Sequence, residues 1–313
     1  MALEITRQDA RVAALAGLVD YAGLFPPESL DMAGAVTGYR RALGGEYSWI
    51  VDHFICPTSR LEELAATLVP SLVRGETPWR IVAVGDSREA HLLGAVDSDR
   101  AFIKAFETVM GSGSRVEIVE LKVPASVDAV EVAEASRRLG RFASFEVSWT
   151  DPDFEASLAA LAEARTTSGR ALGAKLRTGG VTADAFPQPK TVARFILTCR
   201  ELGLPLKATA GLHHPFRHQD PATGFVHHGF VNLLVAAALA SEGEGVDEIT
   251  GALADDDPAS FAFDRSGIEW RHHRLGASTL AETRSSLFTA YGSCSIVEPV
   301  DDLIALGVLP VDR

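Results

Sequence analysis

Residues 171–177 read ALGAKLR, and residues 205–211 read PLKATAG. Each is a short apolar segment that contains one lysine, Lys175 in the first segment and Lys207 in the second. Successive side chains of a β-strand point to opposite faces. If both segments are strands, each lysine therefore faces one side of the sheet and its small, apolar neighbours face the other. This pattern predicts two cations on the inner face of a sheet whose outer face is covered by helices.

On either side of these segments, short apolar runs alternate with longer helical runs, which is typical of a parallel sheet with crossover helices. Eight segments are predicted strands: 17–21, 48–55, 80–84, 116–123, 143–148, 171–177, 205–209 and 267–274. Helices are expected between them, the last at 280–290. Eight strand–helix units favour a single (β/α)8 TIM barrel of the α/β class over an open doubly wound sheet, which usually has fewer strands.

The composition fits one globular domain with a large core. Of the 313 residues, 47% are hydrophobic and 23% are charged, as in ordinary globular proteins. No linker rich in proline, glycine or serine divides the chain. We therefore predict a single barrel domain over residues 1–313, with an extended loop at about 211–229 and a C-terminal tail from about 291.

The net charge of −13 argues against nucleic acid and anionic membranes as partners, because both require clustered lysine and arginine. The three cysteines are scattered and lack the spacing of a disulfide or zinc framework. Neither a signal peptide nor an apolar run long enough to span a bilayer is recognisable. We expect a cytoplasmic protein that binds a small anionic substrate, and homo-oligomerisation is a further expectation.

Charged side chains are also expected inside the fourth and fifth predicted strands. The segment IVELKVP turns Glu120 and Lys122 inward, and the segment FEVSW turns Glu146 and Ser148 inward. Charges at the carboxyl ends of barrel strands are where barrel enzymes hold their chemistry. The two lysines could instead pair with Glu120 and Glu146 in a structural ion network, because a buried charge without a partner costs several kcal/mol.

Two neighbouring lysines favour one kind of chemistry. The amine of one can attack a carbonyl carbon to form a Schiff base, while the ammonium of the other makes the first lose its proton more easily. At about 5 Å and an effective dielectric of about 20, two unit charges repel by roughly 3 kcal/mol. We therefore expect Lys175 to be the nucleophile and Lys207 to promote its deprotonation, an effect that Glu120 or Glu146 would oppose.

Three short motifs resemble the class I, Schiff-base aldolases of the deoxyribose-phosphate aldolase type, which are also (β/α)8 barrels. Residues 175–179, KLRTG, are similar to the K-T-S-T-G motif of the sixth strand in that family. Residues 207–211, KATAG, are similar to K-P-A-G-G of its seventh strand. Residues 276–280, GASTL, resemble the G-A-S-S-L turn that ends its eighth strand, so the resemblance covers about 110 residues of the C-terminal part of the chain.

The resemblance implies a lyase that cleaves or forms a carbon–carbon bond of a small carbonyl compound without a metal or other cofactor. Lys175 would form the Schiff base, Lys207 would be the second lysine, and Glu120 would move protons where the family has an aspartate. Backbone amides would bind a substrate phosphate, or Arg177 would select a carboxylate. The expected substrate contacts are Arg177, Thr178, Gly179, Gly180, Thr209, Gly211, Gly276, Ser278 and Glu146. Arg177 is bulkier than the family's residue, and Ala210 replaces a glycine.

A metal-dependent lyase, hydrolase or isomerase is the main alternative. Seven of the nine histidines fall in the last third of the chain, most of them in the loop after the seventh predicted strand. Imidazoles suit zinc, so His213 and His214 with Glu146 would form an open catalytic metal site. Without a metal, the two histidines would contact the substrate. Asp20 and His53 are secondary candidates for substrate contacts, and a non-catalytic barrel that binds an anion is the third interpretation.

Overall fold

The computed structural model describes residues 9–71, 77–89, 91–124 and 127–310. Eight parallel strands close into the predicted (β/α)8 barrel, in the order β1, β13, β7, β6, β5, β4, β3 and β2. Helices alternate with these strands along the chain. The barrel strands are β1 (Val19–Tyr21), β2 (Val51–Pro57), β3 (Trp79–Val84), β4 (Ser114–Lys122), β5 (Phe142–Glu146), β6 (Leu172–Arg177), β7 (Leu206–Thr209) and β13 (Phe288–Ser293).

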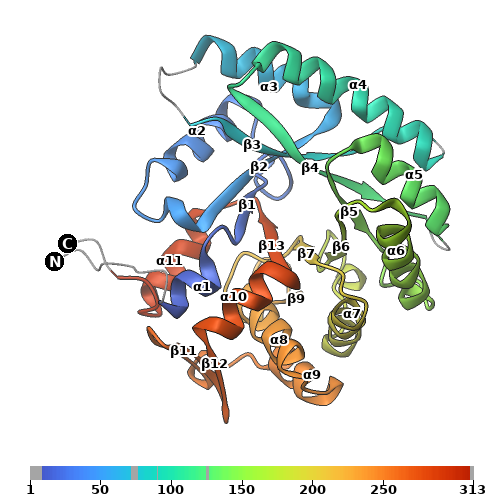
Figure 1. Ribbon diagram of the computed structural model, residues 1–313. Coiled ribbons are helices and arrows are strands. Elements are labelled where there is room, and N and C mark those ends of the chain that lie inside the picture. Colours follow the sequence, from blue (N-terminus) through green and yellow to red (C-terminus); the bar gives the residue numbers. More distant parts are fainter. Residues whose placement is uncertain (1–8, 72–76, 90, 125–126, 311–313) are drawn as a thin grey trace. The chain divides into compact units, whose positions relative to one another are not determined.

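The described residues fall into two compact units, and the first unit is Asp20–Lys175. Within it, the helices lie outside the strands β2 to β4 (Figure 1). The helices of the first unit are α2 (Met32–Leu43), α3 (Leu61–Leu68), α4 (Leu92–Met110), α5 (Ala129–Leu139) and α6 (Phe154–Ser168), with short 3-10 turns at Ser48–Ile50, Thr58–Arg60 and Val69–Ser71.

Local sequence signals fix several helix ends in the first unit. Asp31 caps α2, because its carboxylate accepts a hydrogen bond of 2.7 Å from the backbone N–H of Gly34. Asp128 caps α5 in the same way, through the N–H of Val130 at 2.9 Å. Gly140 ends α5 at a φ of 67°, a left-handed conformation that glycine adopts without a steric penalty.

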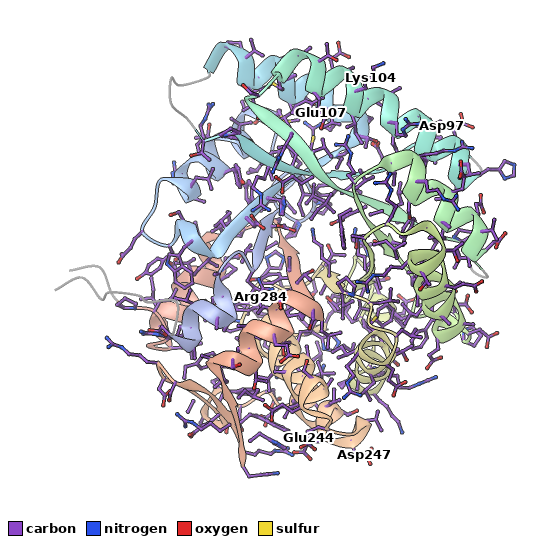
Figure 2. The ribbon with its side chains drawn as sticks, viewed as in Figure 1. Asp97, Lys104, Glu107, Glu244, Asp247 and Arg284 are labelled. Carbon is purple, nitrogen blue, oxygen red and sulfur yellow. The ribbon has the colours of Figure 1, made fainter. Side chains whose placement is uncertain are left out.

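Ion pairs lie on the outer surface around α4 and α5. Arg138 lies 2.6 Å from Asp97, and Arg141 lies 2.8 Å from Glu107. Figure 2 shows Asp97, Lys104 and Glu107 along α4. Pairs of this exposed kind contribute about 0–1 kcal/mol each. The apolar faces of the helices, packed against the strands, therefore hold this layer in place.

The second unit combines the described residues up to Val19 with those from Leu176 onward. Its helix α8 is buried from Phe230 to Ala240, so the longest apolar run of the sequence is a core helix. No helix within the described ranges combines the length and apolar character needed to cross a membrane. The remaining elements of the second unit are α1 (Ala10–Leu15), α7 (Pro189–Glu201), the hairpin β8 (His218–Gln219) and β9 (Val226–His227), α8 (Phe230–Glu242), α9 (Val246–Ala254), β10 (Phe261–Phe263), β11 (Gly267–Trp270), β12 (His273–Gly276), α10 (Ala277–Ser286) and α11 (Val297–Ala305), with 3-10 turns at Ala183–Ala185 and Pro258–Ser260.

The eighth barrel strand is β13, so the prediction of this strand at 267–274 is wrong. That range instead contains β11 and most of β12, which form an antiparallel hairpin in a three-stranded sheet with β10. The helix predicted at 280–290 is α10, which ends earlier, at Ser286. The expected tail from about 291 contains the end of β13 and the helix α11.

A weak strand signal explains this error. The sequence of β13 is FTAYGS, in which Phe288, Thr289 and Tyr291 favour a strand but Ala290 and Gly292 interrupt the pattern, and the helix predicted at 280–290 overlaps its first residues. Its place in the barrel comes from parallel pairing with β7, in which Phe288 lies opposite Leu206 and Gly292 opposite Thr209. Such pairing joins residues that are far apart in the chain, and a local pattern does not encode it.

Tyr39, Phe54 and Trp79 form a buried aromatic cluster in the first unit. The ring centroid of Tyr39 is 4.8 Å from that of Trp79 and 5.4 Å from that of Phe54. The rings of Phe54 and Trp79 are 5.5 Å apart. These contacts join α2 to β2 and β3, and aromatic pairs at such distances add to the stability gained from burial.

We predict that Phe54→Ala lowers the free energy of unfolding by about 3–5 kcal/mol, because it leaves a cavity among packed rings. The matched control is Phe102→Ala on α4, where the phenylalanine is 40% exposed; its effect should stay within about 1 kcal/mol. Denaturant unfolding of both variants measures the difference. Equal losses at the two positions would contradict the described core.

Candidate functional site

Lys175 lies between two carboxylates in the first unit. Its Nζ is 2.7 Å from Oε2 of Glu120 and 3.1 Å from Oε2 of Glu146. The exposed fractions of the three side chains are 8% for Lys175, 2% for Glu120 and 11% for Glu146. We refer to these three residues as the Lys175 cluster.

Three neighbouring strands bring the Lys175 cluster together. The register places Glu146 of β5 opposite Lys175 of β6, and Glu120 of β4 opposite Ser144 of β5. Ser144 and Glu146 are two residues apart, so their side chains share one face of the sheet. The alternation expected from the sequence therefore leads to direct contact among the three side chains.

The charges of the Lys175 cluster have a chemical consequence. Two carboxylates stabilise the ammonium form of Lys175, and the ammonium offsets the desolvation of the carboxylates. A nucleophilic amine forms only after this ammonium loses a proton. The Oε2 atom of Glu120, at 2.7 Å, is in position to accept it. The cluster thus places an amine in direct contact with a carboxylate that could accept its proton.

The Lys175 cluster lies toward the carboxyl ends of its strands. Glu146 is the last residue of β5, and Glu120 is two residues before the end of β4. Lys122, the last residue of β4, is exposed. In (β/α)8 barrels, substrates bind at the carboxyl ends of the strands. The register aligns Lys122 with Glu146 and Glu146 with Lys175, so the exposed cation and the buried amine lie at the same level, two strands apart. This arrangement suits a substrate that carries both a carbonyl and a negative charge.

Lys207 is the second residue of β7 and is buried. Its neighbours Leu206 and Ala208 are fully buried, as expected for residues that face helices. Lys207 belongs to the second unit, whereas Lys175 belongs to the first. The expected effect of Lys207 on the proton of Lys175 therefore stays a prediction.

In the second unit, Thr178 connects the end of β6 to the end of β7. Its backbone N–H donates to the carbonyl of Thr209 at 2.8 Å, and its hydroxyl donates to the carbonyl of Ala210 at 2.7 Å. Ala210 and Gly211 follow with φ of 68° and 74°. A non-glycine residue in this left-handed conformation costs about 1–3 kcal/mol, and such strain is often found at functional sites.

The other expected substrate contacts of this region lie beside the same turn. A Cβ at Gly179 would be 2.9 Å from a ring carbon of Phe186 and 3.1 Å from the carbonyl oxygen of Ala210, so a larger residue would force these neighbours to shift. Arg177 is exposed, and its Nε donates to the carbonyl of Gly179 at 3.0 Å. Gly180 is half-buried. Six of the expected contacts are thus grouped where β6 and β7 end: Arg177, Thr178, Gly179, Gly180, Thr209 and Gly211.

Gly276 and Ser278 do not follow a barrel strand, and this expectation was wrong. Gly276 ends β12 and precedes α10, and Ser278 is exposed in the first turn of α10. The strand β12 belongs to the antiparallel sheet of β10, β11 and β12. The cause is the misplaced eighth strand, since the true one begins only at Phe288.

His213 and His214 pair with carboxylates of α11 in the second unit. The Nδ1 atom of His213 is 3.1 Å from Oε2 of Glu298, and that of His214 is 2.6 Å from Oδ2 of Asp302. The sulfur of Cys294 is 3.8 Å from both ring nitrogens of His213. A sulfur equidistant from both nitrogens is aligned with neither lone pair, which is unlike the geometry of a cysteine–histidine nucleophile.

Among the described residues, two groups of histidines and carboxylates have ligand atoms close enough together to hold a metal ion. They are the group Asp20, Asp52 and His53 and the group Glu248, His272 and His273. The alternative set expected from the sequence, His213, His214 and Glu146, is not one of these groups.

Asp20 and His53 belong to an ion network in the first unit. The Nδ1 atom of His53 is 2.8 Å from Oδ1 of Asp20, and its Nε2 atom is 3.3 Å from Oε2 of Glu117. Arg80 pairs with both Asp52 and Glu117. Burial raises the pKa of the Asp52 carboxyl. Since an arginine already compensates the acidic groups, this network is better suited to holding strands together than to binding a metal ion.

Glu117, which the sequence analysis did not single out, belongs to this network and lies on β4, the strand that also carries Glu120. The register of β3 and β4 shifts at this point, so Glu117 is the extra residue of a β-bulge. It precedes Glu120 by three residues, or about 10 Å along the strand. Two acids three positions apart in this strand, Glu117 and Glu120, could have indicated the bulge, because regular alternation would turn one of them against the helices.

Comparison with protein-family models gives no match to this chain, and comparison with curated proteins gives none either. The likeness to Schiff-base aldolases therefore depends on the short motifs alone. The (β/α)8 barrel is common among enzymes, but it supports many chemistries. The residues of the site, and not the fold, therefore determine which reaction is possible.

His228, between β9 and α8, is the most deeply buried histidine of the loop after β7. Its Nε2 donates a hydrogen bond of 2.7 Å to the carbonyl of Pro187. Burial lowers the pKa of His228 to about 4, and it also lowers the pKa of His218 and of His227. His228 is therefore neutral in the folded protein at neutral pH.

We predict that this burial makes stability depend on pH. Below the pKa of about 6.5 in the unfolded chain, His228 takes up a proton when the protein unfolds, so stability falls as the pH falls toward 4. Between pH 7 and pH 5 the loss due to this residue should be about 2 kcal/mol. His228→Gln keeps a donor toward Pro187 without titrating, so the variant should lack this part of the pH dependence in denaturant unfolding. Parallel pH profiles of the two proteins would contradict the prediction.

Proposed function

We propose that this protein is a lyase that forms a Schiff base between Lys175 and a small anionic carbonyl compound. The observation that carries the proposal is the Lys175 cluster, in which a buried amine lies 2.7 Å from a carboxylate toward the carboxyl ends of barrel strands. The resemblance of residues 175–179 to the lysine motif of Schiff-base aldolases supports it.

The first step of the proposed reaction is imine formation. Glu120 accepts a proton from the ammonium of Lys175, and the free amine attacks the carbonyl carbon to give a carbinolamine. Glu120 then returns its proton to the departing hydroxyl, which leaves as water. The lysine gains a carbon–nitrogen double bond, and its nitrogen carries the positive charge. Glu146 remains ionised and stabilises that charge.

The second step uses the protonated imine as an electron sink. When the bond between the α and β carbons of the substrate breaks, the electron pair moves toward the iminium nitrogen and forms an enamine. The β-hydroxyl of the substrate gives its proton to a carboxylate and becomes the carbonyl of the first product. Protonation of the enamine and hydrolysis of the imine release the second product and restore Lys175. Each proton transfer requires a base within hydrogen-bond distance, a role that Glu120 can fill.

An anionic substrate fits the charges at this end of the first unit. Lys122 is exposed at the end of β4 and follows Glu120 by two residues, so both side chains are on the same face. A phosphate or carboxylate held by Lys122 would direct the carbonyl of the same molecule toward Lys175. The rival interpretation, a purely structural ion network, predicts no reaction with any carbonyl compound.

We predict that borohydride reduces an imine on Lys175. The full-length chain is incubated with a panel of small aldehydes, ketones and sugar phosphates, reduced, and mapped by peptide mass spectrometry. Lys175→Arg should abolish the adduct, because arginine keeps the charge between Glu120 and Glu146 but forms no imine at neutral pH. Lys104→Arg, on the exposed surface of α4 (Figure 2), is the matched control and should retain it.

This experiment separates the two interpretations of the Lys175 cluster. An adduct confined to Lys175 supports a catalytic lysine. If no carbonyl compound in the panel is trapped there, or if Lys104→Arg and Lys175→Arg lose labelling equally, the Schiff-base mechanism is wrong.

We further predict that Glu120→Gln slows imine trapping roughly 100-fold, because general acid–base catalysis contributes at least this factor in many enzymes. Glu146→Gln removes the same charge from the partner at 3.1 Å and should slow trapping less than 10-fold. Stopped reactions at short times give both rates. If Glu146→Gln slowed trapping more than Glu120→Gln, Glu146 and not Glu120 would be the residue that transfers the proton.

A further inference from the structure

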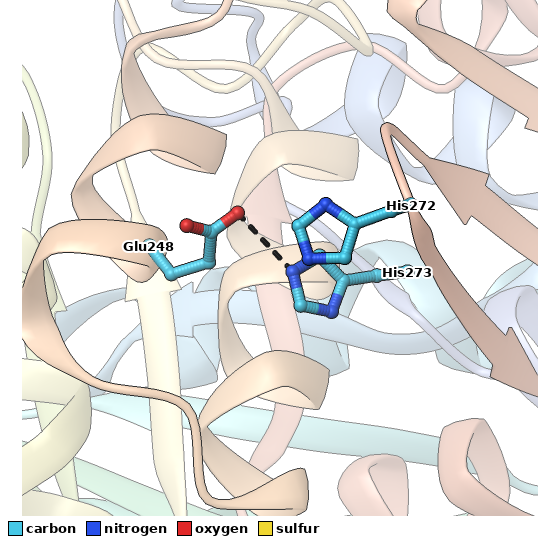
Figure 3. A group of neighbouring side chains, drawn as sticks. All are labelled: Glu248, His272 and His273. Carbon is cyan, nitrogen blue, oxygen red and sulfur yellow. Dashed lines mark hydrogen bonds and ion pairs between the residues drawn. The ribbon is translucent and has the colours of Figure 1, made fainter.

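Glu248, His272 and His273 gather in the second unit, with both rings beside the carboxylate (Figure 3). One ligand atom from each residue lies within 4.8 Å of the others, and Nε2 of His273 is 3.1 Å from Oε1 of Glu248. Two ligands of one tetrahedral zinc ion, each about 2.0–2.1 Å from it, stand about 3.3 Å apart. Nε2 of His273 and Oε1 of Glu248 are therefore already nearly at the separation that zinc requires. The ring of His272 is exposed and can move toward these two atoms.

The backbone places two consecutive histidines on the same side. Alternation along a strand would point them to opposite faces, yet the ring centroids of His272 and His273 are only 4.0 Å apart. Arg271, in the turn between β11 and β12, has a φ of 53°. A non-glycine residue in this conformation costs about 1–3 kcal/mol. The turn therefore departs from a relaxed hairpin in a way that brings two imidazoles together.

The surroundings of His273 resemble those of a metal ligand. Its Nδ1 atom, on the far side of the ring from Glu248, is 3.8 Å from Oε1 of Glu244. At 3.8 Å no hydrogen bond is formed, but a small movement of Glu244 would give the carboxylate–imidazole contact that orients metal-bound histidines. The buried ring of Trp270 is stacked with His273 at a centroid distance of 5.9 Å and an angle of 10°, which limits rotation of the imidazole. Figure 2 labels Glu244, which precedes α9, and Asp247, which lies in the first turn of that helix.

We propose that Glu248, His272 and His273 form a binding site for a divalent transition-metal ion such as zinc. Two imidazoles and one carboxylate suit zinc better than magnesium or calcium, which prefer oxygen ligands alone. A water molecule would complete a tetrahedral site. The ion would join the β11–β12 hairpin to α9, both within the second unit. This site is independent of the chemistry proposed for Lys175.

Calorimetric titration of the untagged, chelator-treated full-length chain with zinc chloride tests the proposal. We expect one zinc ion per chain. His272→Ala and Glu248→Gln should each weaken binding at least 10-fold, and both change partly exposed side chains, so the fold should persist. The matched control is His91→Ala, at an exposed histidine of the first unit, which should bind as the original chain does.

A charge substitution provides a second, opposite test. The Nη1 atom of Arg271 is 4.0 Å from Oε1 of Glu248, so its charge opposes a bound cation. Arg271→Gln should therefore tighten zinc binding by ~3-fold or more. Zinc at 100 times its dissociation constant should also raise the ratio of folded to unfolded protein roughly 100-fold in the original chain, but not in Glu248→Gln.

Three results would overturn the proposal. One is the absence of saturable zinc binding to the chelator-treated chain. Another is zinc binding by His272→Ala and Glu248→Gln with the same stoichiometry and affinity as the original chain. The third is loss of binding in His91→Ala to the same extent, which would indicate scattered surface coordination.

Discussion

The ion pairs of Lys175 with Glu120 and Glu146 are the interaction on which the first unit's interior depends. Each group alone would be costly to bury, and removal of one partner from a buried pair commonly costs 3–5 kcal/mol. Because the three residues come from β4, β5 and β6, the pairs require these strands to be neighbours in a fixed register. The same contacts thus define the local fold and set the charge around the amine of Lys175.

Stability and reactivity make opposite demands on this lysine. The carboxylates hold it as an ammonium ion, whereas attack on a carbonyl requires the neutral amine. Direct proton transfer between Nζ of Lys175 and Oε2 of Glu120, which are 2.7 Å apart, meets both demands. The charged cluster is then kept until a substrate is bound. The proposed reaction then exchanges one cation, the ammonium, for another, the iminium, between the same two carboxylates. Because the net charge of the cluster does not change during imine formation, the two carboxylates favour the product as well as the starting state. This is the strongest physical argument for a catalytic role.

The sequence predicted the parts of the fold that depend on local alternation. Glu120, Glu146 and Lys175 meet because strict alternation holds from the bulge to the end of β4 and through β5 and β6. The prediction failed where pairing over long distances decides: Ala290 and Gly292 interrupt the strand pattern of β13, and the predicted helix at 280–290 overlapped its start. The bulge at Glu117 was missed because an inserted residue changes register without changing composition. The histidine pair of the β11–β12 turn was hidden for another reason, since only the backbone conformation of Arg271 places both rings together.

The central claim is that the nitrogen of Lys175 bonds to the substrate while Glu120 and Glu146 remain beside it. A crystal structure of the chain after reduction with its best carbonyl partner tests this most directly. The account predicts continuous electron density from Nζ of Lys175 to the former carbonyl carbon, with both carboxylates within hydrogen-bond distance of that nitrogen. An unmodified Lys175 still paired with Glu120 and Glu146, with the adduct on a different lysine, would contradict it.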